Sequence, residues 1–472
     1  MSFALNRPQG SRGGWRGGRG RGDFRSTAQK QAAPTSPEPP TGDLIRALLK
    51  DDLKQDAMLW QADATITGCQ TVASYNWLDR KEPTIVVPGK PPRWTPFDEA
   101  KTVKEDKGEY FRDQNGARFP KHPLEPAIAA AAALKPDALM NVDVVACGST
   151  LGNLLRFIRG QDKRFRILVE MVEDTVFFTR RENTPDEKIL DVRGFGHSFP
   201  EAYTTWDAGA KGSVSHQRLL RYQFGGLDFL VRFEGDGSLA SSALNAGDGS
   251  VPDSPTASPD DLADSLMMNS VSPATPSTSE PLKIVQTGDA IVDQATIFDL
   301  KTRSLYWKGK QDTLADELPR FWIAQIPNFI LAYHDKGLFR REEITVQDIR
   351  GRVKKWEGDN KPALALLAAV IHRIVDLVRA QNDKKLELRH ATPGRLEVRE
   401  QLQGAGQALS PQVQDLWRTI QRGESVRTEQ SDSPERSDKE DDDDDLNWDE
   451  GSEKDFTACS LEDCGYCGHC TY

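Results

Sequence analysis

The sequence predicts an α/β protein in which a mixed central β-sheet is flanked by helices. Segments 227–236 and 296–302 alternate β-branched or aromatic residues with polar ones, which is typical of half-buried strands. Segment 364–378 has the broad apolar face of a helix that covers a sheet. Between residues 141 and 182, a strand, a helix and two more strands follow one another. Strands and helices therefore belong to one folded region.

The remaining elements follow from the same local patterns. Further strands are expected where Val, Ile, Phe and Tyr gather between turn residues: 72–79, 83–87, 142–146, 165–171, 174–179, 216–224 and 328–334. Further helices are expected at 44–53, 126–134, 151–159, 183–192, 316–325 and 344–356. A glycine turn at 194–196 should lead into another short helix, which carries Glu201.

The composition limits where this protein can act. Hydrophobic residues make up 37% of the 472 residues and the net charge is −11, so the chain is more polar than an average globular protein. The longest apolar runs, 127–134 and 363–371, are too short to span a bilayer. No charged-then-apolar signal sequence is present. We expect a soluble protein of the nucleus, the cytoplasm or both, with no membrane partner.

Shifts in composition divide the chain into a folded domain and segments that we expect to be disordered. The domain should occupy residues 60–385, interrupted by a Ser/Pro/Asp/Gly-rich insertion at 237–280. An Arg/Gly-rich tail covers 1–42, and an acidic tail covers 425–455. A cysteine cluster follows at 459–470.

The Arg/Gly-rich tail combines the residue types that contact RNA. Glycine keeps the backbone mobile, arginines bind phosphates and aromatic rings stack on bases. The residues of this tail that we expect to bind RNA are Arg12, Trp15, Arg16, Arg19 and Arg21. A solvated linker or a methylated protein-interaction tail is the alternative interpretation.

Four C-terminal cysteines have a spacing that suits a metal. Cys459, Cys464, Cys467 and Cys470 follow the pattern C-x4-C-x2-C-x2-C, with glycines that permit tight turns. Four thiolates are a usual ligand set for a structural Zn²⁺ ion, and His469 could replace one of them. An iron–sulfur ligand set or a redox-active tail remains an alternative.

The two alternating segments carry the chemistry. Glu234 and Asp236 share one strand face, and so do Asp299 and Lys301, because strand side chains alternate. If the two strands pair, three carboxylates and one ammonium meet. Carboxylates suit Mg²⁺ or Mn²⁺, and a lysine can orient the attacking water, so the group fits a metal-dependent phosphodiesterase of the PD-(D/E)xK type. The alternative is a solvated strand face with an ordinary cross-strand ion pair.

Four motifs in order resemble the DXO-type decapping nucleases, a family of PD-(D/E)xK proteins that act on RNA 5′ ends. The motifs lie at 196–203, 233–236, 299–302 and 321–327. The resemblance implies a nuclease-like fold and one or two Mg²⁺ or Mn²⁺ ions. It also implies removal of incomplete caps, with 5′→3′ degradation of the RNA. Carried over, it places Glu201, Glu234, Asp236 and Asp299 around the metal, Lys301 as the catalytic lysine and Gln325 as a site-lining amide.

The sequence departs from the family pattern at two places. Asp299 stands where the family has glutamate, so the carboxylate reaches about one methylene less far. The family's phosphate-binding arginine is absent near Cys147 and Gly148. The predicted function is a divalent-metal-dependent RNA 5′-end hydrolase or nuclease. The alternative is an inactive RNA-binding or scaffold protein on the same fold, with a larger exoribonuclease as its partner.

Overall fold

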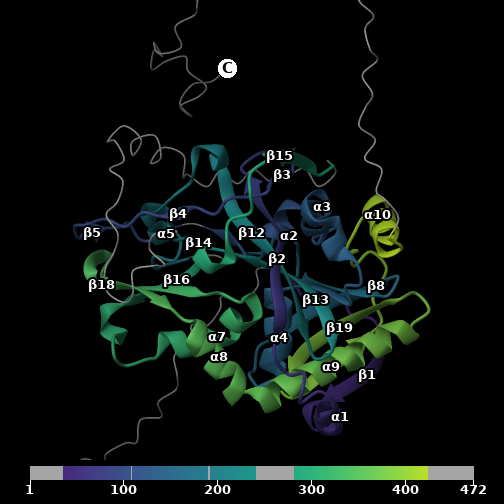
Figure 1. Ribbon diagram of the computed structural model, residues 1–472. Helices are drawn as coiled ribbons and strands as arrows, with labels where there is room; N and C mark the ends of the chain where they lie inside the picture. The colour runs from purple at the N-terminus through teal and green to yellow at the C-terminus, as the bar shows by residue number, and fades with distance from the viewer. Residues whose placement is uncertain (1–35, 108, 190–191, 241–280, 424–472) are drawn as a thin grey trace, which may run out of the picture. The chain divides into compact units, whose positions relative to one another are not determined.

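The computed structural model describes residues 36–107, 109–189, 192–240 and 281–423, and it contains two large sheets with helices packed on them (Figure 1). Residues 1–35 of the predicted Arg/Gly-rich tail, the acidic tail, the cysteine cluster and residues 241–280 of the predicted insertion lie outside the described residues. Residues 36–42 of the tail are described, and Glu38 pairs with Arg389. No helix within the described ranges is long and apolar enough to cross a membrane.

The larger sheet is mixed, as predicted. Most neighbouring strands run antiparallel, whereas β7 is parallel to both its neighbours and β15 is parallel to β3. Its strands, in spatial order, are β1 (Leu44–Leu49), β20 (Arg395–Arg399), β19 (Lys385–Thr392), β8 (Phe165–Val172), β9 (Thr175–Arg181), β7 (Val144–Cys147), β13 (Leu227–Glu234), β12 (Ser213–Phe224), β2 (Thr67–Leu78), β3 (Thr84–Val87) and β15 (Lys283–Gln286).

A second sheet lies beside the end of β13. Its strands, in spatial order, are β11 (Thr204–Thr205), β4 (Arg93–Trp94), β14 (Gly237–Ser238), β16 (Ile297–Ser304), β17 (Asn328–Asp335), β18 (Leu338–Asp348) and β5 (Lys101–Thr102). A short ribbon pairs β6 (Tyr110–Phe111) with β10 (Lys188–Ile189). The fold therefore has two large sheets where the sequence suggested one.

Helices cover both faces of the larger sheet. The helices are α1 (Lys54–Leu59), α2 (Gln114–Arg118), α3 (Glu125–Leu134), α4 (Gly148–Ile158), α5 (Ser198–Tyr203), α7 (Thr313–Ala324), α8 (Arg350–Asp359), α9 (Lys361–Ala380) and α10 (Pro411–Gln421). Along β13, Phe229 and Val231 join the core that α4, α7 and α9 build, whereas Leu230 joins the core formed with α3 and α10. This alternation confirms a mixed sheet flanked by helices.

Three predicted helices are wrong in whole or in part. Residues 44–49 form the edge strand β1, because this segment pairs with β20. The described part of 183–192 contains the short strand β10 and no helix. Residues 344–348 continue β18, which pairs along β17, and α8 begins only at Arg350. In each strand, pairing with a distant segment decides the structure over local preference.

The ordered elements also extend beyond the predicted domain limits. Strand β1 begins at Leu44, before the predicted start at residue 60. Strands β19 and β20 and helix α10 follow the predicted end at residue 385. Within the predicted insertion, Gly237 and Ser238 form β14. The three C-terminal elements complete the larger sheet and one of its helical layers, so they belong to the fold.

Candidate functional site

The site lies where the chain passes from the larger sheet to the second sheet. Segments 227–236 and 296–302, whose pairing the sequence left as a condition, do not pair along β13, because β13 and β16 belong to different sheets. Only the continuation of β13, strand β14, pairs with β16, and it opposes Gly237 to Phe298. This crossing brings Asp236 beside β16, where its Oδ2 accepts a hydrogen bond from the backbone N–H of Leu300 at 2.7 Å.

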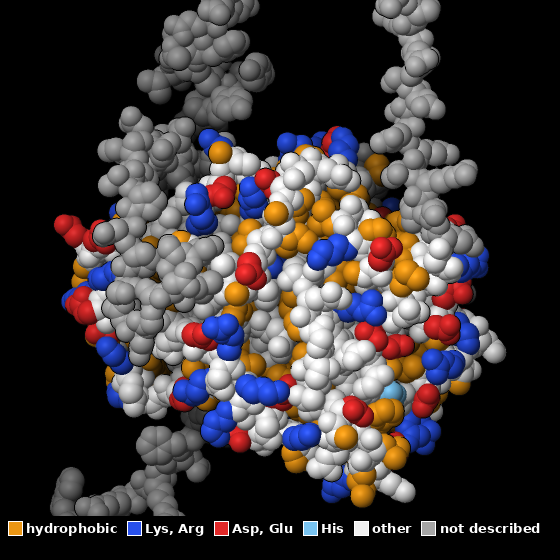
Figure 2. Space-filling view, in the orientation of Figure 1, with side chains coloured by type: hydrophobic (Ala, Val, Ile, Leu, Met, Phe, Trp, Pro, Cys, Tyr) orange, Lys and Arg blue, Asp and Glu red, His pale blue; other side chains and the backbone are white. Residues whose placement is uncertain are grey.

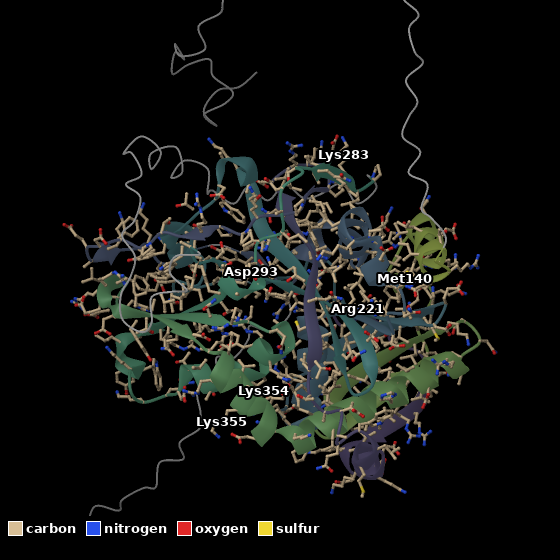
Figure 3. All side chains as sticks on the ribbon, viewed as in Figure 1. Met140, Arg221, Lys283, Asp293, Lys354 and Lys355 are labelled. Atoms are coloured by element: carbon tan, nitrogen blue, oxygen red, sulfur yellow. The ribbon has the colours of Figure 1, made fainter. Side chains whose placement is uncertain are left out.

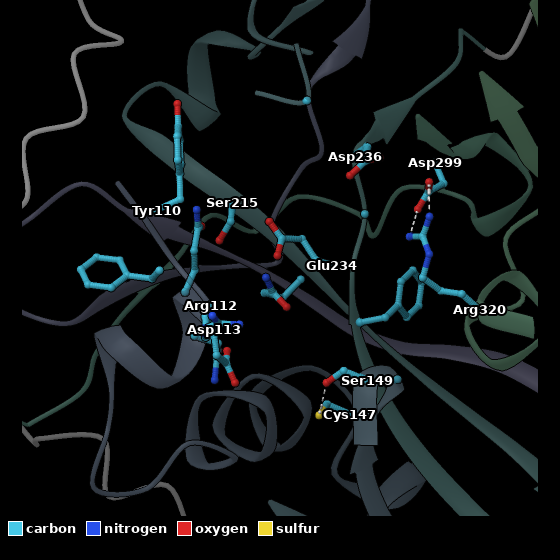
Figure 4. Close-up of a pocket in the computed structure, with 18 of the residues that line it drawn as sticks. Tyr110, Arg112, Asp113, Cys147, Ser149, Ser215, Glu234, Asp236, Asp299 and Arg320 are labelled. Carbon is cyan, nitrogen blue, oxygen red and sulfur yellow. Dashed lines mark hydrogen bonds and ion pairs between the residues drawn. The ribbon is translucent and has the colours of Figure 1, made fainter. Parts of the chain in front are cut away.

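Asp236 and Asp299 are therefore neighbours; Asp236 is half-buried and Asp299 is buried. Asp299 is buried, with 3% of its side chain exposed. Burial, followed by the nearby Asp299 carboxylate, raises the pKa of Asp236 to about 8. Glu234 lies at the exposed end of β13, yet desolvation within the cleft raises its pKa, against the attraction of Arg232. Three carboxylates that the sequence selected thus face one region (Figure 4).

A residue that the sequence analysis did not select neutralises this group. Arg320, from α7, donates hydrogen bonds to both carboxylate oxygens of Asp299, with a distance of 2.7 Å between Nη2 and Oδ1. Despite its desolvation, the pKa of the Arg320 guanidinium is raised by Asp299. Asp312 caps the start of α7, the helix that carries Arg320, by accepting from Ala315 N at 3.0 Å. The only sequence signal was an arginine on a predicted helix.

Glu201 reaches the same cleft from another side. It lies on α5, and burial together with the nearby Asp106 carboxylate raises its pKa. Asp106 accepts from the backbone N–H groups of His197 and Ser198 at 3.1 and 2.9 Å, which fixes the start of α5. Among the described residues, no three His, Cys, Asp or Glu side chains are grouped closely enough to hold a metal ion. The predicted four-carboxylate cluster is therefore not assembled.

Lys301 and Gln325 lie outside the cleft lining. The ammonium of Lys301 pairs with Glu317 of α7 at 3.1 Å. Gln325 ends α7 in a left-handed conformation (φ 47°), and its side-chain amide donates to the carbonyl of Trp322. The structure thus uses Gln325 to end a helix, and Lys301 to join β16 to α7.

The cleft has a volume of about 2780 Å³ and combines these carboxylates with many basic side chains. The basic residues that line it include Arg112, Arg156, Arg159, Lys163, Arg164, Arg166, Arg180, Arg181 and Arg232. The lining also contains further acidic residues, among them Asp106, Asp113 and Glu182. Basic and acidic side chains are thus mixed in the cleft, as they are on the face shown in Figure 2.

Arg232 stands close to the place where the sequence lacks a phosphate-binding arginine. It opposes Cys147 in the parallel pair β13–β7, directly before the N-terminus of α4. Arg232 is buried, and its Nε has no hydrogen-bond partner among the described residues. The sequence did hold a signal, because the alternation that groups Glu234 with Asp236 also puts Arg232 on that face.

The model of a family described as "Domain of unknown function (DUF8563)" matches residues 49–391. The chain belongs to this family. The DUF8563 match runs from the end of β1 to β19 and includes every carboxylate of the cleft discussed above. A search of curated proteins finds no match for this DUF8563 chain.

Solved structures with similar folds come from yeasts. Scheffersomyces stipitis Rai1, in complex with (3′-NADP)⁺ and calcium, has a TM-score of 0.47 and 11% identity over 82% of this chain and 100% of that chain. Candida albicans Rai1, in complex with pU5-Mn²⁺, has a TM-score of 0.44 and 9% identity over 82% and 100%. K. lactis Dxo1, in complex with manganese, has a TM-score of 0.43 and 10% identity over 78% and 96%.

The carboxylate oxygens of this cleft are of the ligand type that hard divalent cations prefer. Mg²⁺ and Mn²⁺ are bound by one or two carboxylates, with water and substrate oxygens completing the shell. Asp236 and Asp299 are two such carboxylates. Because they are desolvated and lie beside each other, a positive charge between them is favourable. Arg320 supplies that charge in this structure. A cation at Asp299 would share the carboxylate with Arg320 or displace it.

Proposed function

We propose that this protein is a divalent-metal-dependent hydrolase of RNA 5′ ends. The observation that supports it most is the pair of neighbouring carboxylates, Asp236 and Asp299, within a cleft whose remaining lining is rich in arginine. Carboxylates that can hold a cation and arginines that can hold phosphates are the two parts that phosphoester hydrolysis needs. At about 2780 Å³, the cleft exceeds the roughly 300–1,000 Å³ of small-molecule pockets and suits the end of a polymer.

The carboxylates and the basic residues of the cleft have separate roles in this proposal. Asp236 and Asp299 would hold the cation, which supplies a polarised phosphate and an activated water when bound. Arg232, beside the N-terminus of α4, would hold a phosphate near the carboxylates. Phosphates farther along the RNA would be bound by Arg156, Arg180 and Lys163. Catalysis by Lys301 remains a prediction from the motif, and it requires release from Glu317.

Incubating the full chain with RNAs that carry a 5′-triphosphate, a 5′-monophosphate or a cap tests the proposal. We expect Mn²⁺-dependent release of the 5′ group or of nucleotides, which EDTA abolishes and which Asp236→Ala and Asp299→Asn lose. Asp228→Asn is the matched control, because Asp228 lies on β13, the strand that leads to Asp236, pairs with Arg221 and does not line the cleft. Equal activity of wild type and both cleft variants would refute the proposal.

A second candidate is an RNA-binding protein without catalysis. The observation that favours it is the engagement of the catalytic groups with other side chains: Arg320 occupies both oxygens of Asp299, and Lys301 pairs with Glu317. This candidate predicts RNA binding that Asp236→Ala leaves unchanged, with no turnover of any 5′ group in Mn²⁺ or Mg²⁺. The incubation described above therefore distinguishes the two functions.

A further inference from the structure

A loop beside the cleft exposes two aromatic side chains. Strand β16 ends at Ser304, and the short 3₁₀ helix η6 (Leu305–Trp307) leads into residues 308–312 before α7. Tyr306 is 66% exposed and Trp307 is 38% exposed. Every other large hydrophobic residue of the described chain with comparable exposure is aliphatic. This loop is therefore the one place, among the described residues, where two large rings meet solvent side by side.

The loop holds its rings in a defined arrangement. The ring centroids of Tyr306 and Trp307 are 5.2 Å apart and the rings are nearly perpendicular, at 85°. Backbone hydrogen bonds from Lys308 N to Leu305 O (3.1 Å) and from Lys310 N to Trp307 O (3.0 Å) fix the turn. The rings are thus preorganised, which lowers the entropy cost of binding a flat ligand.

One ammonium lies against these rings, and a second lysine is close by in the sequence. The ammonium of Lys310 lies 3.3 Å from the centroid of Tyr306 and has no carboxylate partner among the residues that the structure describes. Lys308 follows Trp307 and pairs with Glu343 of β18. Aromatic rings with interleaved lysines suit nucleobases and phosphates. Protein interfaces, by contrast, are depleted of lysine at their centres.

The loop adjoins the cleft directly. The side-chain amide of Gln311 donates to Asp316 Oδ2 at 2.6 Å, and Asp316 lines the cleft. Lys301, on the strand that leads into the loop, pairs with Glu317, which also lines the cleft. An RNA strand that leaves the cleft on this side would reach Tyr306 and Trp307, which lie in the loop just before α7.

We propose that Tyr306, Trp307 and Lys310 form a stacking platform for unpaired bases of single-stranded RNA that extends from the cleft. The rings would stack on one or two bases, and Lys310 would contact the adjoining phosphate. This inference rests on the proposed function only for the identity of the polymer. It concerns binding alone, so it can fail while hydrolysis at the cleft stands, and it can hold in an inactive protein.

Photocrosslinking locates the contact on the full chain. Single-stranded RNA containing 4-thiouridine would be irradiated with wild-type protein, and the crosslinked tryptic peptides identified. We expect crosslinks in peptide 304–308, which contains both rings and is separate from the Arg/Gly-rich tail. Crosslinks confined to other peptides would overturn the proposal.

Affinity measurements with matched variants supply the second test. Tyr306→Ala and Trp307→Ala should each weaken binding of a single-stranded RNA by about tenfold, whereas Tyr306→Phe and Trp307→Phe should bind within about twofold of wild type. Binding of an abasic strand of equal length should not change. Leu59→Ala is the control, because Leu59 is 73% exposed on α1. Stacking would be refuted if the alanine and phenylalanine variants lost equal affinity for RNA, or if the alanine variants lost equal affinity for the abasic strand. It would also be refuted if a protein partner, and not RNA, covered the loop.

Discussion

Arg320 of α7 holds both carboxylate oxygens of Asp299 on β16, and Asp299 is the carboxylate that lies next to Asp236. The guanidinium thus supplies the positive charge beside Asp299 that a divalent cation would otherwise supply. Arg320 is 45% exposed, whereas Asp299 is 3% exposed, so the arginine can leave for solvent and the aspartate cannot. A divalent cation at Asp299 would therefore compete with Arg320 or share the carboxylate with it.

Replacing Arg320 should make the stability of the protein depend on divalent ions. In Arg320→Ala, Asp299 would be a buried, unpaired carboxylate beside Asp236, which costs about 3 kcal/mol of unfolding free energy. A bound Mn²⁺ ion would offset that cost. We expect thermal unfolding of the variant to shift upwards in Mn²⁺ and back in EDTA, by more than wild type shifts. Arg320→Lys, which keeps a charge, is the control. A variant that responds to Mn²⁺ no more than wild type would contradict a cation site at Asp299.

Arg232 should set the affinity for a 5′-phosphate. Because it lies beside Cys147 at the start of α4 and has an unpaired Nε, Arg232→Gln should remove a charge-assisted contact and weaken binding of 5′-phosphorylated RNA by about tenfold. Binding of the 5′-hydroxyl strand should change little. Arg221→Gln is the matched control, because Arg221 lies on β12 away from the cleft lining (Figure 3). Equal losses on both RNAs would refute a phosphate contact, provided that thermal unfolding shows the variant folded.

The sequence predicted those parts of the fold and site that depend on local periodicity. Alternation identified β13 and β16, and with them Glu234, Asp236 and Asp299, which the structure places in one cleft. It failed where a distant segment decides the outcome. Segment 344–348 is a strand because β17 lies beside it.

The contacts that the sequence failed to predict at the site were missed for the same reason. Lys301 and Asp299 are held by α7, whose position over β16 no local pattern reveals. Arg232 is different, because the alternation that selected Glu234 also predicts that Arg232 lies on the same face of β13.

Lys163 should make stability increase with pH on the alkaline side. Burial, followed by the nearby charges of Arg156 and Arg180, lowers the pKa of Lys163 to about 8. Between about pH 8 and the unfolded value near 10.4, the unfolded chain binds the extra proton, so this residue's destabilising effect fades as pH rises. Lys163→Met should therefore stabilise the protein by about 2 kcal/mol at pH 7 and by little at pH 10.5. Denaturant unfolding at both values measures this difference.

Lys104→Met is the matched control for that prediction, because Lys104 lines the same cleft but is exposed. A Lys163→Met variant whose effect is equal at the two pH values would contradict the assigned shift. The same protonation bears on ligand binding. Phosphate affinity of the wild-type cleft should fall as pH rises through about 8, since Lys163 loses its charge there, and this fall should be absent from Lys163→Met.

Gly237 should be the residue that tolerates substitution least at the crossing between the sheets. A Cβ at this position would lie 2.4 Å from Cζ of Phe298 and 2.8 Å from the carbonyl oxygen of Pro92. Phe298 is fully buried, so it cannot move aside cheaply. Gly237→Ala should therefore lower the free energy of unfolding by about 1–3 kcal/mol, as overpacking does. It should also displace Asp236 and reduce Mn²⁺ binding.

Denaturant unfolding and calorimetric titration with Mn²⁺ measure these two effects. Gly209→Ala is the matched control, because nothing lies within 4 Å of a Cβ added there. The double variant Gly237→Ala/Phe298→Leu makes room at the contact and should recover part of the loss, with a coupling energy above about 0.5 kcal/mol. If Gly237→Ala is as stable as Gly209→Ala, the close approach of β14 to β16 does not hold Asp236 in place. The carboxylate pair would then need another explanation.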